Sequence, residues 1–191
     1  MYFLFSRFTA PIVLDVEPKN GPTDGGYPVI ITGRNFGRMM HHPQPYIGGV
    51  ACTQTTWISD SVIKCIAPQG HGKDKNVVVW VGEQHSDVEN NYFQYDVPIV
   101  DSVEPNHCRT IGGCKLTITG HNFGHEQGAH IGVYVDGHLC AGIGRGDQPQ
   151  WLSHHKMECV VGHGIGEKLD VSVEVSEQIS PVNELFHFNY G

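Results

Sequence analysis

Hydrophobic and polar side chains alternate along short segments of the chain, and Gly, Pro, Asn and Asp interrupt these segments. A period of two places successive side chains on opposite faces of a β-strand. No window keeps a helical period over several turns. The pattern therefore predicts an all-β fold of short strands joined by turns. In the first half of the chain, the expected strands cover residues 12–16, 27–32, 46–52, 61–66, 76–82 and 91–95.

The pattern of the first half returns in the second half. Residues 10–37 align with residues 97–124 at a constant offset of 87 and without a gap. Within this match ITGRNFG, at 31–37, corresponds to ITGHNFG, at 118–124. The agreement continues after small insertions, where VVVWVGEQ corresponds to VSVEVSEQ. Self-similarity in the same order indicates two homologous units, each of a size that can bury its own core.

The repeat also predicts where the domains begin and end. We expect one domain at 11–96 and a second at 97–191, with residues 1–10 as an N-terminal extension or the last strand of a preceding repeat. This reading makes the chain a segment of a longer repeat protein. Between the units no Gly/Ser linker intervenes, and Pro98 has a fixed φ. We therefore expect the two units in an elongated, semi-rigid arrangement.

The repeated sequence motifs resemble those of a known domain family. In the first unit they read PKNGPTDGGYPVIITGRNFG, VAC, SVIKCIAP, VVVWV and FQY. This order resembles the IPT/TIG domain, an immunoglobulin-like fold shared by plexins, Met-type receptors and some transcription factors. The turns QGHGKDKNV and GHGIGEKLDV resemble those of large cell-surface repeat proteins. The resemblance implies two tandem immunoglobulin-like β-sandwiches. The second unit departs from the pattern where CRTI replaces GPTD.

The ITGxNFG words are expected to be a structural joint in each unit rather than a binding site. Glycine can adopt backbone angles that other residues avoid. Asparagine tolerates the left-handed region and can bond its own backbone, and the phenylalanine is expected to plug the end of the sandwich. Binding is expected instead in the parts that differ, 38–46, 125–131 and 142–150. The joint residues are Gly33, Asn35, Phe36, Gly37, Gly120, Asn122, Phe123 and Gly124.

Six cysteines in a domain of this kind favour an oxidising compartment, hence an extracellular or cell-surface location. Four of them occupy equivalent places in the two units, which predicts one internal bridge in each. The other two stand together in the second unit only, where the first has Gly21 and Tyr27. The alternative is six reduced thiols in a cytosolic protein. The expected bridges are Cys52–Cys65, Cys108–Cys114 and Cys140–Cys159.

Charge and motifs disfavour several function classes. The net charge is −8, and the chain has no run of Lys or Arg, which disfavours nucleic-acid binding. No stretch of about 18 apolar residues is present, so this segment is not expected to contact a membrane. G-x-S-x-G, H-E-x-x-H and Walker A motifs are absent from the sequence. We therefore expect neither catalysis nor a cofactor.

The sequence offers two weak candidates for ligand contacts. Arg145, Gly146 and Asp147 lie in the insertion that distinguishes the second unit, where an RGD tripeptide can engage an integrin-type receptor. A Gly-rich turn with a charge pair is the favoured alternative. The chain also has 13 histidines, but their spacing falls in expected loops and favours exposed imidazoles over a metal site.

Three tryptophans could stack on sugars. Trp57 and Trp151 occupy equivalent places, which favours a structural role. Trp80 lies in an alternating strand and could face either side of its sheet.

The resemblance implies a non-catalytic structural or adhesion segment of a cell-surface or extracellular repeat protein. It would act as a semi-rigid spacer and a protein-interaction module, with protein partners that include neighbouring repeats or homophilic contacts. The alternatives are a carbohydrate- or ligand-binding module, or accessory domains of a larger enzyme or receptor. A transcription-factor dimerisation domain is disfavoured by the net charge of −8 and the expected bridges.

Overall fold

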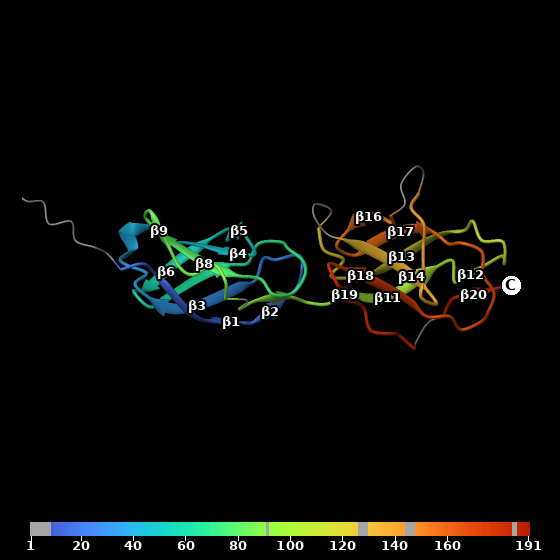
Figure 1. Cartoon of the computed structure of the whole chain (residues 1–191), viewed down its shortest axis with the longest axis horizontal. Helices are drawn as coiled ribbons and strands as arrows, with labels where there is room; N and C mark the ends of the chain where they lie inside the picture. Colours follow the sequence, from blue (N-terminus) through green and yellow to red (C-terminus); the bar gives the residue numbers. More distant parts are fainter. Residues whose placement is uncertain (1–8, 91, 126–129, 144–147, 185–186) are drawn as a thin grey trace, which may run out of the picture. The chain divides into compact units, whose positions relative to one another are not determined.

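Figure 1 shows the computed structural model of the chain, which describes residues 9–90, 92–125, 130–143, 148–184 and 187–191. Contacts within the chain divide it into two compact units, and their main boundary falls between Gln94 and Tyr95. Among the described residues, the regular elements are β-strands and one short 3₁₀ helix, η1 (Met39–His41).

The first unit contains two antiparallel sheets of four strands and one small pair of strands (Figure 1). The first sheet has the order β1 (Ile12–Glu17), β3 (Pro28–Arg34), β7 (Val62–Ile66) and β6 (Thr55–Ser59). The second sheet has the order β5 (Val50–Ala51), β4 (Gln44–Ile47), β8 (Val77–Val81) and β9 (Gln84–His85). The small pair joins β10 (Gln94–Tyr95) to β2 (Asn20–Gly21).

The second unit has the same topology. Its first sheet has the order β11 (Ile99–Glu104), β13 (Lys115–His121), β17 (Lys156–Val160) and β16 (Gln150–Ser153). Its second sheet has the order β15 (His138–Leu139), β14 (Ile131–Val135), β18 (Val171–Val175) and β19 (Gln178–Ile179). The small parallel pair is β12 (His107–Cys108) with β20 (Asn189–Tyr190). The first strand of each unit also carries its register shift at the equivalent place.

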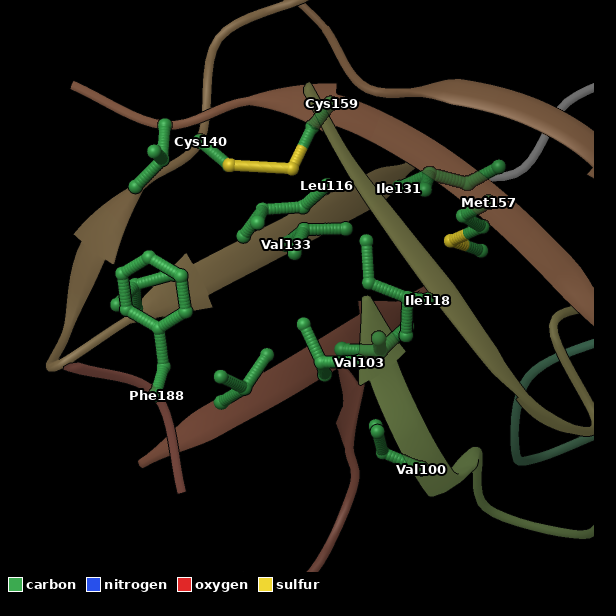
Figure 2. Packing of buried hydrophobic residues seen from close by; sticks show 14 of the residues in the cluster. Val100, Val103, Leu116, Ile118, Ile131, Val133, Cys140, Met157, Cys159 and Phe188 are labelled. Carbon is green, nitrogen blue, oxygen red and sulfur yellow. A yellow bond between two sulfur atoms is a disulfide. The ribbon is translucent and has the colours of Figure 1, made fainter. Parts of the chain in front are cut away.

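Alternation along the strands builds each core. In the first unit, Val29 and Ile31 of β3 are fully buried, and so are Val77 and Val79 of β8 in the other sheet. Figure 2 shows the equivalent arrangement in the second unit, where side chains from both sheets meet beside a disulfide. Burying one such side chain stabilises the fold by about 1.5–3 kcal/mol. Those labelled in Figure 2 include Val103, Leu116, Ile118, Val133, Met157 and Phe188.

The predicted all-β, immunoglobulin-like fold is confirmed, and the individual strands differ from the expected ones in several places. Residues 46–52, expected as one strand, include a reversal at Gly48 and Gly49, whose φ angles are 58° and 83°. The strands β4 and β5 therefore form a hairpin. The two-residue strands β2 and β9 were not expected from the sequence, nor was β6 (Thr55–Ser59), in which no side chain is fully buried. A strand without a buried face shows no hydrophobic alternation, so its sequence reads as a loop.

Replacing Phe36 by alanine should lower the free energy of unfolding of the first unit by about 3–5 kcal/mol, because a buried aromatic ring leaves a cavity. The Phe36 side chain is 0% exposed. Urea denaturation of the chain measures the change. Arg34→Ala, at an exposed position two residues earlier, should stay within about 0.5 kcal/mol. Similar losses for the two variants would contradict a plug role for Phe36.

Candidate functional site

The asparagine of each ITGxNFG joint ties two distant parts of its unit together. Asn35 has a φ of 61°, and its Nδ2 donates a hydrogen bond to the Ala10 carbonyl at 3.0 Å. Asn122 has the same φ and donates to the Val97 carbonyl at 3.1 Å. The expected left-handed conformation is therefore present. The expected bond within the local backbone is instead a bond to the chain that enters the first strand.

The first glycine of each joint plays a different part from the one expected. Gly33 lies inside β3, outside the left-handed region. A Cβ atom there would collide with the Ile12 carbonyl and the Phe36 ring. Gly120 has the same surroundings in the second unit. These glycines are needed for close approach, so the prediction of unusual backbone angles is wrong for them. The turn glycines do show such angles, with φ values of 71° at Gly37 and 69° at Gly124.

Two tryptophans complete the joints. The Trp57 indole nitrogen donates to the Gly37 carbonyl at 3.1 Å. In the second unit, the Trp151 indole nitrogen donates to the carbonyls of Phe123 and Gly124 at 3.1 Å and 3.2 Å. The equivalence of Trp57 and Trp151 in the sequence thus corresponds to the same hydrogen-bonding role. The two indole N–H groups and the turn carbonyls that they reach are therefore already paired in hydrogen bonds within their own unit.

The six cysteines form three disulfides in the structure. The pairs are the three that the repeat predicts, with Cα–Cα distances of 5.9, 6.0 and 5.7 Å respectively for Cys52–Cys65, Cys108–Cys114 and Cys140–Cys159. The described part of the chain has no free cysteine. Figure 2 shows the Cys140–Cys159 bridge at the margin of the second core.

Other candidates from the sequence receive less support. Residues Arg145, Gly146 and Asp147 lie outside the described residues, as do parts of the expected binding loops 125–131 and 142–150. Within the described ranges, no group of three or more His, Cys, Asp or Glu could hold a metal ion. A hollow of about 460 Å³ lies in the second unit, with Leu139, Val161 and Tyr190 in its wall.

The outer face of the second sheet in the first unit carries an aromatic surface. Side chains that pair directly across antiparallel strands lie on the same face of a sheet. Gln44 pairs with Trp80, which pairs with His85, and in the next row Ala51 pairs with Tyr46, which pairs with Val78. We call this surface the Trp80 face, composed of Gln44, Tyr46, Ala51, Val78, Trp80 and His85.

Trp80 and His85 are exposed and lie side by side at the β9 edge of the Trp80 face. The Trp80 side chain is 40% exposed, which answers the question of its orientation left open by the sequence. The two ring centroids are 4.6 Å apart, with the planes tilted by 45°. The His85 Nδ1 lies 2.8 Å from the Ser86 carbonyl, which can only accept a hydrogen bond. His85 therefore carries a proton on Nδ1, and in the neutral ring Nε2 is an acceptor.

The equivalent face of the second unit is built differently. Tyr134 and Tyr46 occupy equivalent places, but Glu174 stands where the first unit has Trp80, and Ile179 where it has His85. The Tyr134 hydroxyl donates to a Glu174 carboxylate oxygen at 2.8 Å. This hydrogen bond to Glu174 raises the pKa of the Tyr134 phenol. The second face thus presents a carboxylate in an internal hydrogen bond in place of an exposed indole.

The family model of the IPT/TIG domain matches residues 11–95 and again residues 98–188. The chain belongs to the IPT/TIG family. The resemblance to the IPT/TIG domain that the repeated sequence motifs showed is confirmed. The ITGxNFG joints are then repeated structural features of two IPT/TIG domains, and the Trp80 face is a surface on which the two domains differ.

Two solved structures match the chain at low sequence identity. A surface glycan-binding protein from Prevotella bryantii is 15% identical with a TM-score of 0.57, and the match covers 90% of the chain and 41% of that protein. The extracellular region of plexin A4 is 20% identical with a TM-score of 0.45, and the match covers 95% of the chain and 18% of the plexin. The chain therefore spans less than half the length of either protein.

The disulfides also bear on the compartment in which the IPT/TIG domains fold. Such bridges form and persist in oxidising environments, so they indicate an extracellular or cell-surface location. In the part of the chain that the structure describes, no helix is long and apolar enough to cross a membrane.

Replacing Asn35 by alanine should destabilise the first domain by about 2–3 kcal/mol, because it removes a hydrogen bond and places a Cβ-bearing residue in the left-handed region. Asn35→Gly removes the same hydrogen bond but tolerates the backbone angle, so it should cost roughly half as much. Urea denaturation of both variants separates the two contributions. Equal losses would show that the backbone angle contributes nothing.

Peptide mapping without reduction should recover Cys108 linked to Cys114, with no thiol that reacts with a labelling reagent in the native chain. Changing both cysteines to alanine should lower the free energy of unfolding by about 2 kcal/mol, since the bridge closes a short loop. The longer loop of Cys140–Cys159 should give a larger loss of about 3 kcal/mol. A peptide that links Cys108 or Cys114 to any other cysteine would refute the assignment.

Proposed function

We propose that the two IPT/TIG domains are a non-catalytic structural or adhesion segment of a cell-surface or extracellular protein. In this role they act as a semi-rigid spacer and as a protein-interaction module. We place the domains at 11–96 and 97–191, with residues 1–10 as an extension or the end of a preceding repeat. The partners would be other proteins, neighbouring repeats of the same chain, or a second copy.

The observation that carries this proposal is the repeated joint. The same asparagine, glycine and tryptophan roles occur in both domains, and the asparagine Nδ2 and tryptophan Nε1 groups each donate a hydrogen bond to a backbone carbonyl. A catalytic or ligand-binding motif would leave polar groups directed at a substrate instead. The repeated ITGxNFG motif therefore supports a structural role, in which both domains use the same motif to stabilise the fold. The segment would therefore contribute length and surface rather than catalysis.

The short connection between the domains supports the spacer role. The last strand of the first domain ends at Tyr95, and the first strand of the second begins at Ile99. Within this connection Pro98 has a restricted φ, and the Val97 carbonyl accepts a hydrogen bond from the Asn122 side-chain amide. Flexible linkers are longer and rich in Gly and Ser. Restriction at two of three residues favours a preferred arrangement of the domains in solution.

Small-angle X-ray scattering tests the spacer role directly. A single compact domain of this length would have a radius of gyration of about 16 Å. We expect a clearly larger value, because a semi-rigid spacer would keep the centres of mass of its two domains apart. A variant with Gly-Ser-Gly-Ser inserted after Asp96 is the matched control and should broaden the distance distribution. A radius near that of one compact domain, or no response to the insertion, would reject a semi-rigid spacer.

A further inference from the structure

The Trp80 face has the chemistry of a binding surface that the spacer role does not use. Trp80 is 40% exposed on this face, and covering its indole ring with a ligand would remove apolar surface from water. Its strand β8 is an inner strand between β4 and β9, and the Trp80 and His85 ring centroids are 4.6 Å apart. The result is an exposed aromatic plane, packed beside a second ring, on the outer face of a sheet.

We propose that the Trp80 face binds a neutral carbohydrate, namely a β-linked pyranose chain that stacks a C–H face on the Trp80 ring. A pyranose with equatorial hydroxyls presents C–H groups above and below its ring and hydroxyls around its rim. An aromatic ring can pack against the C–H groups, and hydrogen-bonding side chains beside the ring can bind the hydroxyls. This site is additional to the spacer role and does not depend on it.

The polar groups beside the indole fit the hydroxyl rim of a sugar. His85 donates through Nδ1 to the Ser86 carbonyl, so its Nε2 remains an acceptor for a hydroxyl in the neutral ring. Tyr46 lies on the same face and contributes a phenolic hydroxyl that can donate or accept. The face thus combines one stacking plane with hydrogen-bonding groups of both kinds.

Charge and size both favour a sugar over the other occupants of an exposed sheet face. None of the six residues of the Trp80 face carries a carboxylate, ammonium or guanidinium group. An uncharged surface on a chain of net charge −8 complements a neutral ligand rather than an acidic glycan. A stable protein interface uses roughly 20–30 residues on each side. A face of this extent suits a ligand of a few sugar rings.

The second domain provides a natural control. There Glu174 stands in the place of Trp80, and its carboxylate accepts a hydrogen bond of 2.8 Å from the Tyr134 hydroxyl. No aromatic plane is available at that position, and a carboxylate occupies it. The two domains share a scaffold and differ at the proposed stacking residue, so sugar binding should belong to the first domain alone.

The test is titration of the whole chain with neutral hexasaccharides of β-linked glucose, mannose and xylose, followed by calorimetry and by tryptophan fluorescence. We expect at least one of them to bind and to change the emission of Trp80. Trp80→Ala should weaken binding at least about tenfold. Trp80→Phe, which keeps an aromatic plane, should bind with intermediate affinity. Trp80→Glu, which copies the second domain, should abolish binding.

Glu174→Ala in the second domain is the matched control and should change the affinity less than twofold. Circular dichroism and thermal unfolding verify that each variant keeps its fold. The proposal is overturned if none of the three sugars binds at millimolar concentration, or if Trp80→Glu binds as well as the unchanged chain. It is also overturned if sedimentation shows a dimer that Trp80→Glu dissociates, because the face would then belong to a second copy.

Discussion

Each domain depends on the close approach of its first strand to the glycine inside the ITGxNFG joint. The Ile12 carbonyl and the Phe36 ring both occupy space that a side chain at Gly33 would need. This contact lets the phenylalanine close the end of the core while the Asn35 amide holds the chain that enters the first strand. The second domain repeats every part of the arrangement.

Much of this architecture could be predicted from the sequence, because burial leaves a period of two in strands such as β3 and β8. The repeat also predicted the cysteine pairs, because cysteines at equivalent positions of the two units are expected to form equivalent bridges, which removes most of the other possible pairings. The hydrogen bond from Asn35 to Ala10 could not be predicted, because it joins residues 25 apart through the fold. Nor could the orientation of Trp80, since β8 alternates between a buried and an exposed side and the sequence does not say which faces the core.

The comparison of the two domains separates scaffold from surface. Binding was expected in the loops that differ between the units, yet the most distinctive difference lies on strands, at Trp80 and Glu174. Outward positions of a strand are free of the packing that fixes inward ones, but the sheet still holds them rigidly. A surface of this kind can change its chemistry without altering the core. The differing loops lie partly outside the described residues.

The bridges give the two domains unequal lengths of chain that can respond to force. Pulling on the ends of an unfolded domain cannot extend the residues enclosed by an intact disulfide. In the first domain, one bridge encloses a separation of 13 residues. In the second, two bridges enclose separations of six and 19 residues. An unfolded second domain under tension would therefore extend over a smaller fraction of its chain length than an unfolded first domain. Reduction of the bridges would increase the extended length of the second domain by more than that of the first.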